Sequence, residues 1–234
     1  MTRAAPFGFS RVVFLSHVIT DGAPAFPGDP PVEIRPAATI ERDGYYLQSL
    51  TIGEQAGTHW AAPAHFRAGQ AAADELDPGD FFHPAVVLDA RAAAARDPDF
   101  TLGVAEIARW EASFGAIPPG SAVIVWTGFE DRWDDPTTYL NADPAGRLHY
   151  PGFGAEAAGW LIERRRVGAL GIDTMGIDRV PTRRSAPAGC CSGTTASTWR
   201  TRPGWARCRR PAARSSSGEC GYGAALARRP PCWA

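Results

Sequence analysis

The chain has 234 residues, 44% of them hydrophobic, which suits one domain with an appendage. No apolar run reaches the roughly 18 residues that a membrane-spanning helix needs, and Met1 is not followed by a charged and then apolar export signal. We therefore expect a cytoplasmic protein that does not contact a membrane.

The near-neutral net charge of -1 conceals two dissimilar regions. Residues 1–178 carry 13 arginines and 24 acidic residues, a net charge of -11, and contain all five histidines. Residues 179–234 carry 11 arginines and one acidic residue, Glu219, a net charge of +10, and contain all five cysteines. This contrast predicts a folded domain over 1–178 and a separate tail over 179–234.

The first 178 residues predict a globular domain with more strands than helices, so we expect the α+β class. Short apolar runs predict buried strands, and one alternating run predicts a half-buried strand. Apolar residues at helical spacing predict two helices, and arginines end the second one, where cations suit the helix dipole. The expected strands are 11–19, 47–52 (half-buried), 85–88, 122–126 and 167–172; a turn is expected at 26–30, and helices near 104–114 and 154–166.

The most informative stretch is GEQAGTHWAAPAHF, residues 53–66. It places His59 and His65 six residues apart on a loop that follows a predicted strand, with Gly57 permitting an unusual backbone and Pro63 stiffening the connection. Histidine shuttles protons near neutral pH and frequently binds metals. From the spacing alone, a catalytic or metal-binding role and two structural histidines both remain open.

This stretch resembles the signature of the cyclase family, of the bacterial kynurenine formamidase and isatin hydrolase type. The family pattern is His-x-Gly-Thr-His-x-Asp-x-Pro-x-His, and residues 55–65 match five of its seven defined positions. Further stretches resemble the family in order along residues 11–178: LSHVITDGAPAFPGDP, PAVVLDA, VIVWTGFEDRW and ALGIDTMGID.

The resemblance implies the swivelling β/β/α fold and a homodimer. It also implies a kynurenine formamidase-like hydrolase that cleaves an amide, lactam or lactone of a small, aromatic molecule in tryptophan catabolism. In such enzymes a divalent metal, zinc or manganese, polarises the carbonyl and activates water. By resemblance, His59 falls on a metal-ligand position, His65 on the acid/base position that protonates the leaving nitrogen, and Phe26 on the aromatic that packs against the substrate.

Two departures weaken the implied metal site. Gln55 stands at the first ligand histidine and Ala61 at the ligand aspartate. An amide oxygen is a weak neutral ligand and a methyl group is none, whereas a catalytic zinc site usually has three good protein ligands. We therefore expect weak or absent metal binding, in a metal-dependent hydrolase or a degenerate member of that group. The alternative is a non-catalytic small-molecule-binding relative with a degenerate metal site.

The resemblance stops at Asp178, and the tail lacks any sustained helical or strand period. The genetic code allows residues 179–205 to be an out-of-frame reading of a family-like helix followed by a Glu-Asn motif. We interpret the tail as a frameshifted translation and expect it to be disordered. A basic nucleic-acid-binding arm explains the charge but not the cysteines, so we expect no nucleic-acid partner. The cysteine spacing also matches no compact zinc knuckle.

Residues outside the motif are assigned structural roles. We expect the tryptophans to lie in the core, His17 to be structural, and Asp173 to fix a strand end. The acidic run that begins at Glu130 is expected to be a solvated loop. The tryptophans concerned are Trp110, Trp126, Trp133 and Trp160.

Overall fold

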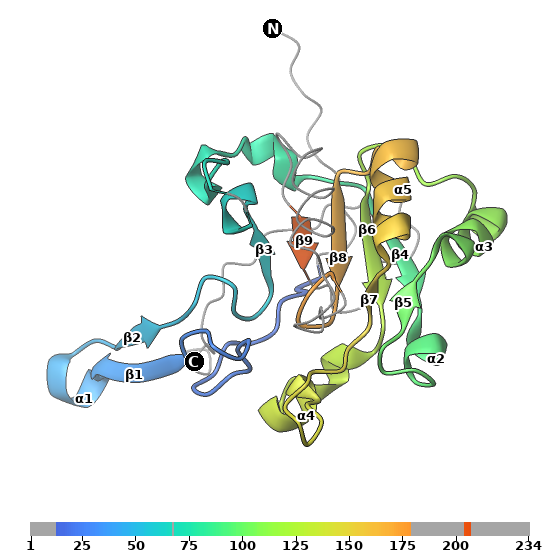
Figure 1. The fold of residues 1–234 in the computed structure, drawn as a ribbon. Helices are drawn as coiled ribbons and strands as arrows, with labels where there is room; N and C mark the ends of the chain where they lie inside the picture. Colours follow the sequence, from blue (N-terminus) through green and yellow to red (C-terminus); the bar gives the residue numbers. More distant parts are fainter. Residues whose placement is uncertain (1–12, 67, 179–203, 207–234) are drawn as a thin grey trace, which may run out of the picture.

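A computed structural model describes residues 13–66 and 68–178 and the short strand Gly204–Ala206. Its centre is a parallel sheet in the order β4-β6-β8, formed by Ala85–Asp89, Ala122–Trp126 and Ala169–Ile172 (Figure 1). All four β8 residues and four of the five in β6 are buried. Parallel strands covered on both faces read as continuous apolar runs, so the expected strands at 85–88, 122–126 and 167–172 are confirmed.

Two helices lie on one face of this sheet (Figure 1): α3 (Val104–Phe114) and α5 (Ala155–Arg165), which confirms both predicted helices. Ile107, Ala157 and Leu161 are fully buried and share one hydrophobic core with the strands. The Arg165 guanidinium binds both carboxylate oxygens of Glu111, at 2.6 and 2.7 Å, and so ties α5 to α3.

A second, smaller core joins the N-terminal segment to the loops that follow β6. It contains Trp133, whose indole N–H donates to the Val18 carbonyl at 3.2 Å, and Tyr139, which is fully buried. The prediction that Trp133 is a core residue is confirmed, and Trp110, Trp126 and Trp160 are half-buried. The strand expected at 11–19 is wrong over residues 13–19, which form no strand. Only His17 and Ile19 are buried there, against side chains of the second core, whereas Val13, Phe14 and Val18 are exposed.

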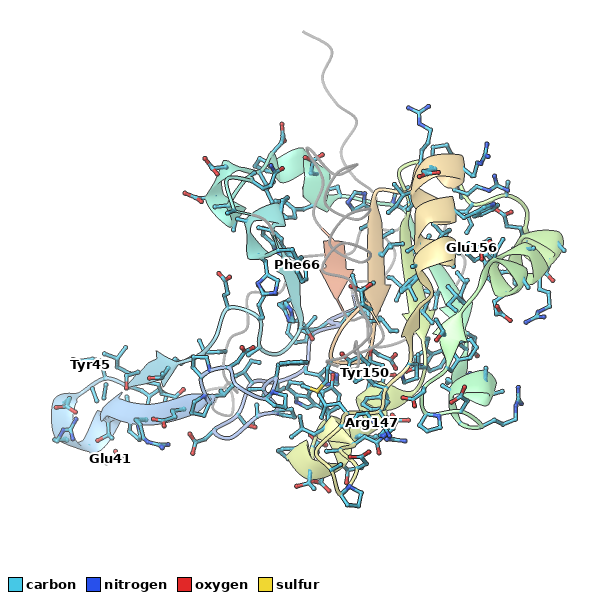
Figure 2. All side chains as sticks on the ribbon, in the orientation of Figure 1. Glu41, Tyr45, Phe66, Arg147, Tyr150 and Glu156 are labelled. Atoms are coloured by element: carbon cyan, nitrogen blue, oxygen red, sulfur yellow. The ribbon has the colours of Figure 1, made fainter. Side chains whose placement is uncertain are left out.

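The third part is a two-stranded antiparallel ribbon that extends away from the sheet, made of β1 (Glu33–Ala38), α1 (Ile40–Asp43) and β2 (Leu47–Thr51). Figure 2 shows Glu41 and Tyr45 near its far end. The β2 strand confirms the predicted strand at 47–52, but the expected half-burial is wrong. Leu47 is 50% exposed and Leu50 is 46% exposed, because no described element packs on the ribbon there.

The mixture of a helix-covered parallel sheet and an antiparallel ribbon confirms the α+β class. Within the described ranges, no helix has the length and hydrophobicity needed to cross a bilayer. The expectation of a disordered tail over 179–234 falls outside the described residues, apart from β9 (Gly204–Ala206).

The remaining elements are short. Strand β9 pairs antiparallel with β3 (His59–Ala61). The others are α2 (Arg91–Ala94), β5 (Thr101–Leu102), α4 (Pro136–Leu140), β7 (Gly152–Phe153) and the 3-10 turns Pro63–His65, Ala73–Glu75, Pro78–Phe81 and Phe129–Arg132.

Candidate functional site

The segment from Gly53 to Phe66, here called the loop, runs from the end of the ribbon through β3 to the 3-10 turn Pro63–His65 and holds both histidines of the sequence motif. Gly57 has a φ of +68°, a conformation that L side chains rarely adopt, and a Cβ there would overlap Cδ1 of Ile19. The Thr58 hydroxyl accepts a hydrogen bond from the His17 amide at 3.0 Å. The loop is therefore fixed against the N-terminal segment and the second core, and only glycine fits at its bend.

His17 provides that anchor from a buried position. Its ring stacks on Trp133 at 4.4 Å between centroids and 13° between planes, and only 4% of the residue is exposed. These contacts confirm the structural role expected for His17.

His59 begins β3 and is half-buried. Its Nδ1 lies 2.9 Å from the carbonyl oxygen of Gly57. A carbonyl only accepts, so this hydrogen bond places the proton on Nδ1 and the lone pair on Nε2. The same arrangement orients metal-binding and proton-accepting histidines in proteins.

His65 ends the 3-10 turn that follows β3, and Pro63 at the first position of that turn is buried. The His65 side chain is exposed, and its ring meets the edge of Phe66 at 4.5 Å. Figure 2 shows Phe66 beside β3. The two histidines therefore lie on adjoining elements, with His65 accessible to a ligand from solvent.

The residues present do not fit a complete metal site. Side chains alternate along a strand, so Ala61 shares a face of β3 with His59 and presents a methyl group there. Gln55, two residues before Gly57, offers only an amide. Across residues 13–66 and 68–178, no three His, Cys, Asp or Glu side chains are grouped so that they could hold a metal ion.

Two aromatic residues bear on the proposed site, Phe26 in the N-terminal segment and Trp60 in β3. Phe26 is 40% exposed on a turn closed by a hydrogen bond from the Asp29 amide to the Phe26 carbonyl at 3.0 Å. Strand alternation directs Trp60 to the opposite face of β3 from His59, and it packs on Phe81 at 4.7 Å. The sequence did not predict this Trp60–Phe81 pair, which packs on the face of β3 opposite His59.

The ends of β6 and β8 are joined by a buried carboxylate. Asp173 accepts hydrogen bonds from the amide and hydroxyl of Thr127, at 2.9 and 2.7 Å, and burial raises its pKa above the usual range. This confirms that Asp173 fixes a strand end. The solvated loop expected around Glu130 is wrong at that residue, which is 6% exposed and accepts from the Trp126 indole at 3.0 Å.

Comparison with known proteins places the chain among close structural relatives. It is 34% identical over 155 residues to an isatin hydrolase of Roseibium aggregatum, a match that covers 64% of this chain. The structure superimposes on isatin hydrolase A from Ralstonia solanacearum with a TM-score of 0.75 and 30% identity, covering 84% of this chain and 78% of the other. Isatin hydrolase A from Labrenzia aggregata, bound to benzyl benzoate, gives 0.75 and 26%, covering 86% and 81%.

The chain spans 58% of the length of its curated Roseibium relative. Residues 13–179 match the family model Cyclase, described as "Putative cyclase". The match covers well over half of the chain and includes the candidate loop, β3 and the parallel sheet; together with the structural superpositions, it shows that the chain belongs to this cyclase family.

Proposed function

We propose that this protein is a hydrolase that cleaves an amide, lactam or lactone bond in a small aromatic molecule. The observation that carries the proposal is the loop geometry: the Gly57 carbonyl orients His59, and His65 is exposed on the adjoining turn. In the proposed reaction, His65 takes a proton from water as the water attacks the carbonyl carbon. His65 then returns this proton to the leaving nitrogen or oxygen as the carbon–nitrogen or carbon–oxygen bond breaks. Phe26 packs against the aromatic part of the substrate.

The substrate class rests on the relatives. Isatin is a lactam fused to a benzene ring, and N-formylkynurenine carries an open-chain amide on a similar ring. We propose that one of these two amide types is cleaved. Activity on N-formylkynurenine would place the protein in tryptophan catabolism. We further propose a cytoplasmic homodimer.

The test is hydrolysis of isatin and of N-formylkynurenine by the purified full chain, with and without added zinc or manganese. We expect His65→Ala to abolish turnover and leave the melting temperature unchanged, because the side chain is exposed. Phe114→Ala, an exposed change on α3 remote in sequence from the loop, is the matched control and should retain full activity. Turnover that survives in His65→Ala would remove this residue from its role.

A second candidate function is non-catalytic binding of a small aromatic molecule. It is favoured by Gln55 and Ala61, which leave the loop without a complete ligand set. The two candidates differ in metal content and turnover. Less than about one-tenth of an equivalent of zinc or manganese per chain, no hydrolysis of either amide and a raised melting temperature with isatin would favour the binding function.

We propose that the tail is a frameshifted translation. The family match ends at residue 179, where the arginine-rich and cysteine-rich composition begins. Sequencing of the coding region should show a one-base insertion or deletion near codon 178 relative to related genes. An uninterrupted frame whose relatives share the same tail would refute this proposal.

A further inference from the structure

Trp133 holds the N-terminal segment in two ways at once. Its ring stacks on the ring of His17, with 4.4 Å between centroids and 13° between planes, and its indole N–H donates to the Val18 carbonyl at 3.2 Å. Trp133 directly follows the turn Phe129–Arg132, is 5% exposed and belongs to the second core. One buried side chain therefore fixes the ring of one residue and the backbone of the next.

The indole of Trp133 is in turn held by the body of the domain. It meets Tyr139 edge to face, with 5.3 Å between centroids and 81° between planes. Tyr139 is fully buried, and its hydroxyl donates to the Asp173 carbonyl at 3.4 Å, directly after β8. A closely packed aromatic side chain with a bonded polar atom has little freedom to move. Trp133 is therefore a fixed point that joins the N-terminal segment to the end of the parallel sheet.

The segment that Trp133 holds contacts the bend of the loop. The His17 amide donates to the Thr58 hydroxyl at 3.0 Å, and the Ile19 side chain occupies the space that a Cβ on Gly57 would need. The Gly57 carbonyl accepts the hydrogen bond from His59 Nδ1 at 2.9 Å. A continuous series of contacts therefore joins the buried indole to the imidazole of the candidate site.

We propose that Trp133 is a positioning residue for the hydrolase proposed above. It acts through His17 and Thr58, which set the place of the His59 ring. The inference rests on the proposed function, and it assigns Trp133 no contact with the substrate. A displacement of about 1 Å at a reacting centre lowers a rate by about 100-fold. A side chain that fixes the loop from a distance therefore controls the fraction of molecules that are ready to react.

The first measurement compares two tryptophan variants of the full chain in hydrolysis of isatin and N-formylkynurenine, well below the melting temperature of each. Trp133→Leu should lower kcat by about 30-fold, because the loop loses its fixed point. Trp110→Leu is the matched control and should keep kcat within about twofold of the unmodified chain. The Trp110 indole also donates to a backbone carbonyl, that of Val87 at 3.1 Å, but it packs on the core of the sheet.

The second measurement changes the link between Trp133 and the site, and it decides the matter if Trp133→Leu does not fold. Thr58→Val keeps the shape of the side chain but removes the hydroxyl that accepts from His17, so kcat should fall by about 10-fold. KM should stay within about twofold, because Phe26 and not Thr58 is the proposed substrate contact. Thr58→Ser keeps the hydroxyl and should restore most of the rate. His17→Phe, which keeps a flat ring for the stack, should retain more activity than His17→Ala.

Hydrogen exchange followed by mass spectrometry tests the positioning without any activity. Trp133→Leu and Thr58→Val should speed exchange in the peptide 53–66 by about 10-fold, while peptides of β6 and α5 keep their rates. Unchanged exchange in both variants would overturn the inference, and so would an unchanged kcat in an active protein or an equal loss of kcat in Trp110→Leu. If the unmodified chain hydrolyses neither compound, the proposed function fails, and the exchange rates alone decide whether Trp133 holds the loop.

Discussion

The parallel sheet and the N-terminal region that carries the candidate loop differ in how fully their apolar side chains are buried. In the sheet, β6 and β8 are buried, and α3 and α5 cover the strands on one face. In the N-terminal region, short strands are joined by turns, and the ribbon of β1 and β2 (residues 33–52), here called the arm, leaves Leu47 and Leu50 half exposed. The difference teaches that the buried sheet serves as the scaffold, whereas the exposed N-terminal region offers surface for ligands and partners. Functional residues usually lie in such exposed connecting segments.

The sharpest test of this contrast compares one leucine from each region. Leu161→Ala, on the buried face of α5, should lower the free energy of unfolding by about 3 kcal/mol, because it leaves a cavity. Leu47→Ala, on the arm, should change that free energy by less than about 0.5 kcal/mol in the monomeric chain. Urea unfolding followed by circular dichroism measures both. Equal losses would mean that the arm is part of the folding core.

The next test introduces the two metal-binding side chains that the loop lacks. Gln55→His/Ala61→Asp adds a histidine and a carboxylate, the latter on the same face of β3 as His59. We expect zinc affinity to rise by about 100-fold, about 2.7 kcal/mol, in a competition titration with a chelating dye. Asp74→His/Glu75→Asp, which changes exposed residues of a neighbouring turn, is the control. An unchanged affinity in the restored variant would show that the loop geometry, and not its composition alone, has departed from a metal site.

A smaller loss of stability is expected at two glycines with positive φ, Gly57 in the loop and Gly44 in the arm. Gly57→Ala combines a positive φ with an overlap against Ile19 and should destabilise the protein by about 2 kcal/mol. Gly44→Ala has a similar φ of +77° with no atom within 4 Å of the new Cβ, so about 1 kcal/mol is expected. Thermal unfolding compares the two. Equal losses would show that contact with Ile19 does not hold the loop.

The smallest effect concerns the junction between the two cores. His149 Nδ1 lies 2.9 Å from Asp99 and Nε2 lies 3.4 Å from Asp143, and these carboxylates raise the pKa of the imidazole, with Asp99 contributing most. A raised pKa stabilises the folded state fully below the unfolded value of about 6.5. This contribution is lost as the pH rises through the folded pKa.

The unfolding free energy should therefore decrease slightly as the pH rises from below about 6.5 through the raised pKa of His149. His149→Gln should remove that part of the pH dependence. A profile unchanged by the substitution would show that the two ion pairs contribute nothing to stability. Asn141→Ala removes a hydrogen bond to the His149 carbonyl and places alanine at a φ of +47°, so it should lower the overall stability but keep the pH dependence, which makes it the control.

Much of the scaffold could be predicted because its signals are local. The apolar run Ala122–Trp126 and the helical spacing around Ile107 each specify their own element, and the structure confirms both. The histidine loop was found in the same way, since a glycine, two histidines and a proline within a few residues form a recognisable pattern. The hydrogen bond between His59 and the Gly57 carbonyl spans two residues and belongs to this local category.

The sequence-based predictions that were wrong share one cause: each concerned burial or strand pairing, which depends on distant residues. Residues 13–19 are β-rich but pair with no strand of the described structure. Glu130 is acidic yet buried, and it is held by the Trp126 indole at its carboxylate and by Asp173 at its backbone amide. The run 47–52 was expected to be half-buried, yet both of its leucines, Leu47 and Leu50, are exposed. The order of residues along the chain sets the hydrophobic periodicity, the division of charge and the histidine motif. Which surfaces meet is a property of the folded molecule, because burial and ion pairing depend on contacts between distant segments.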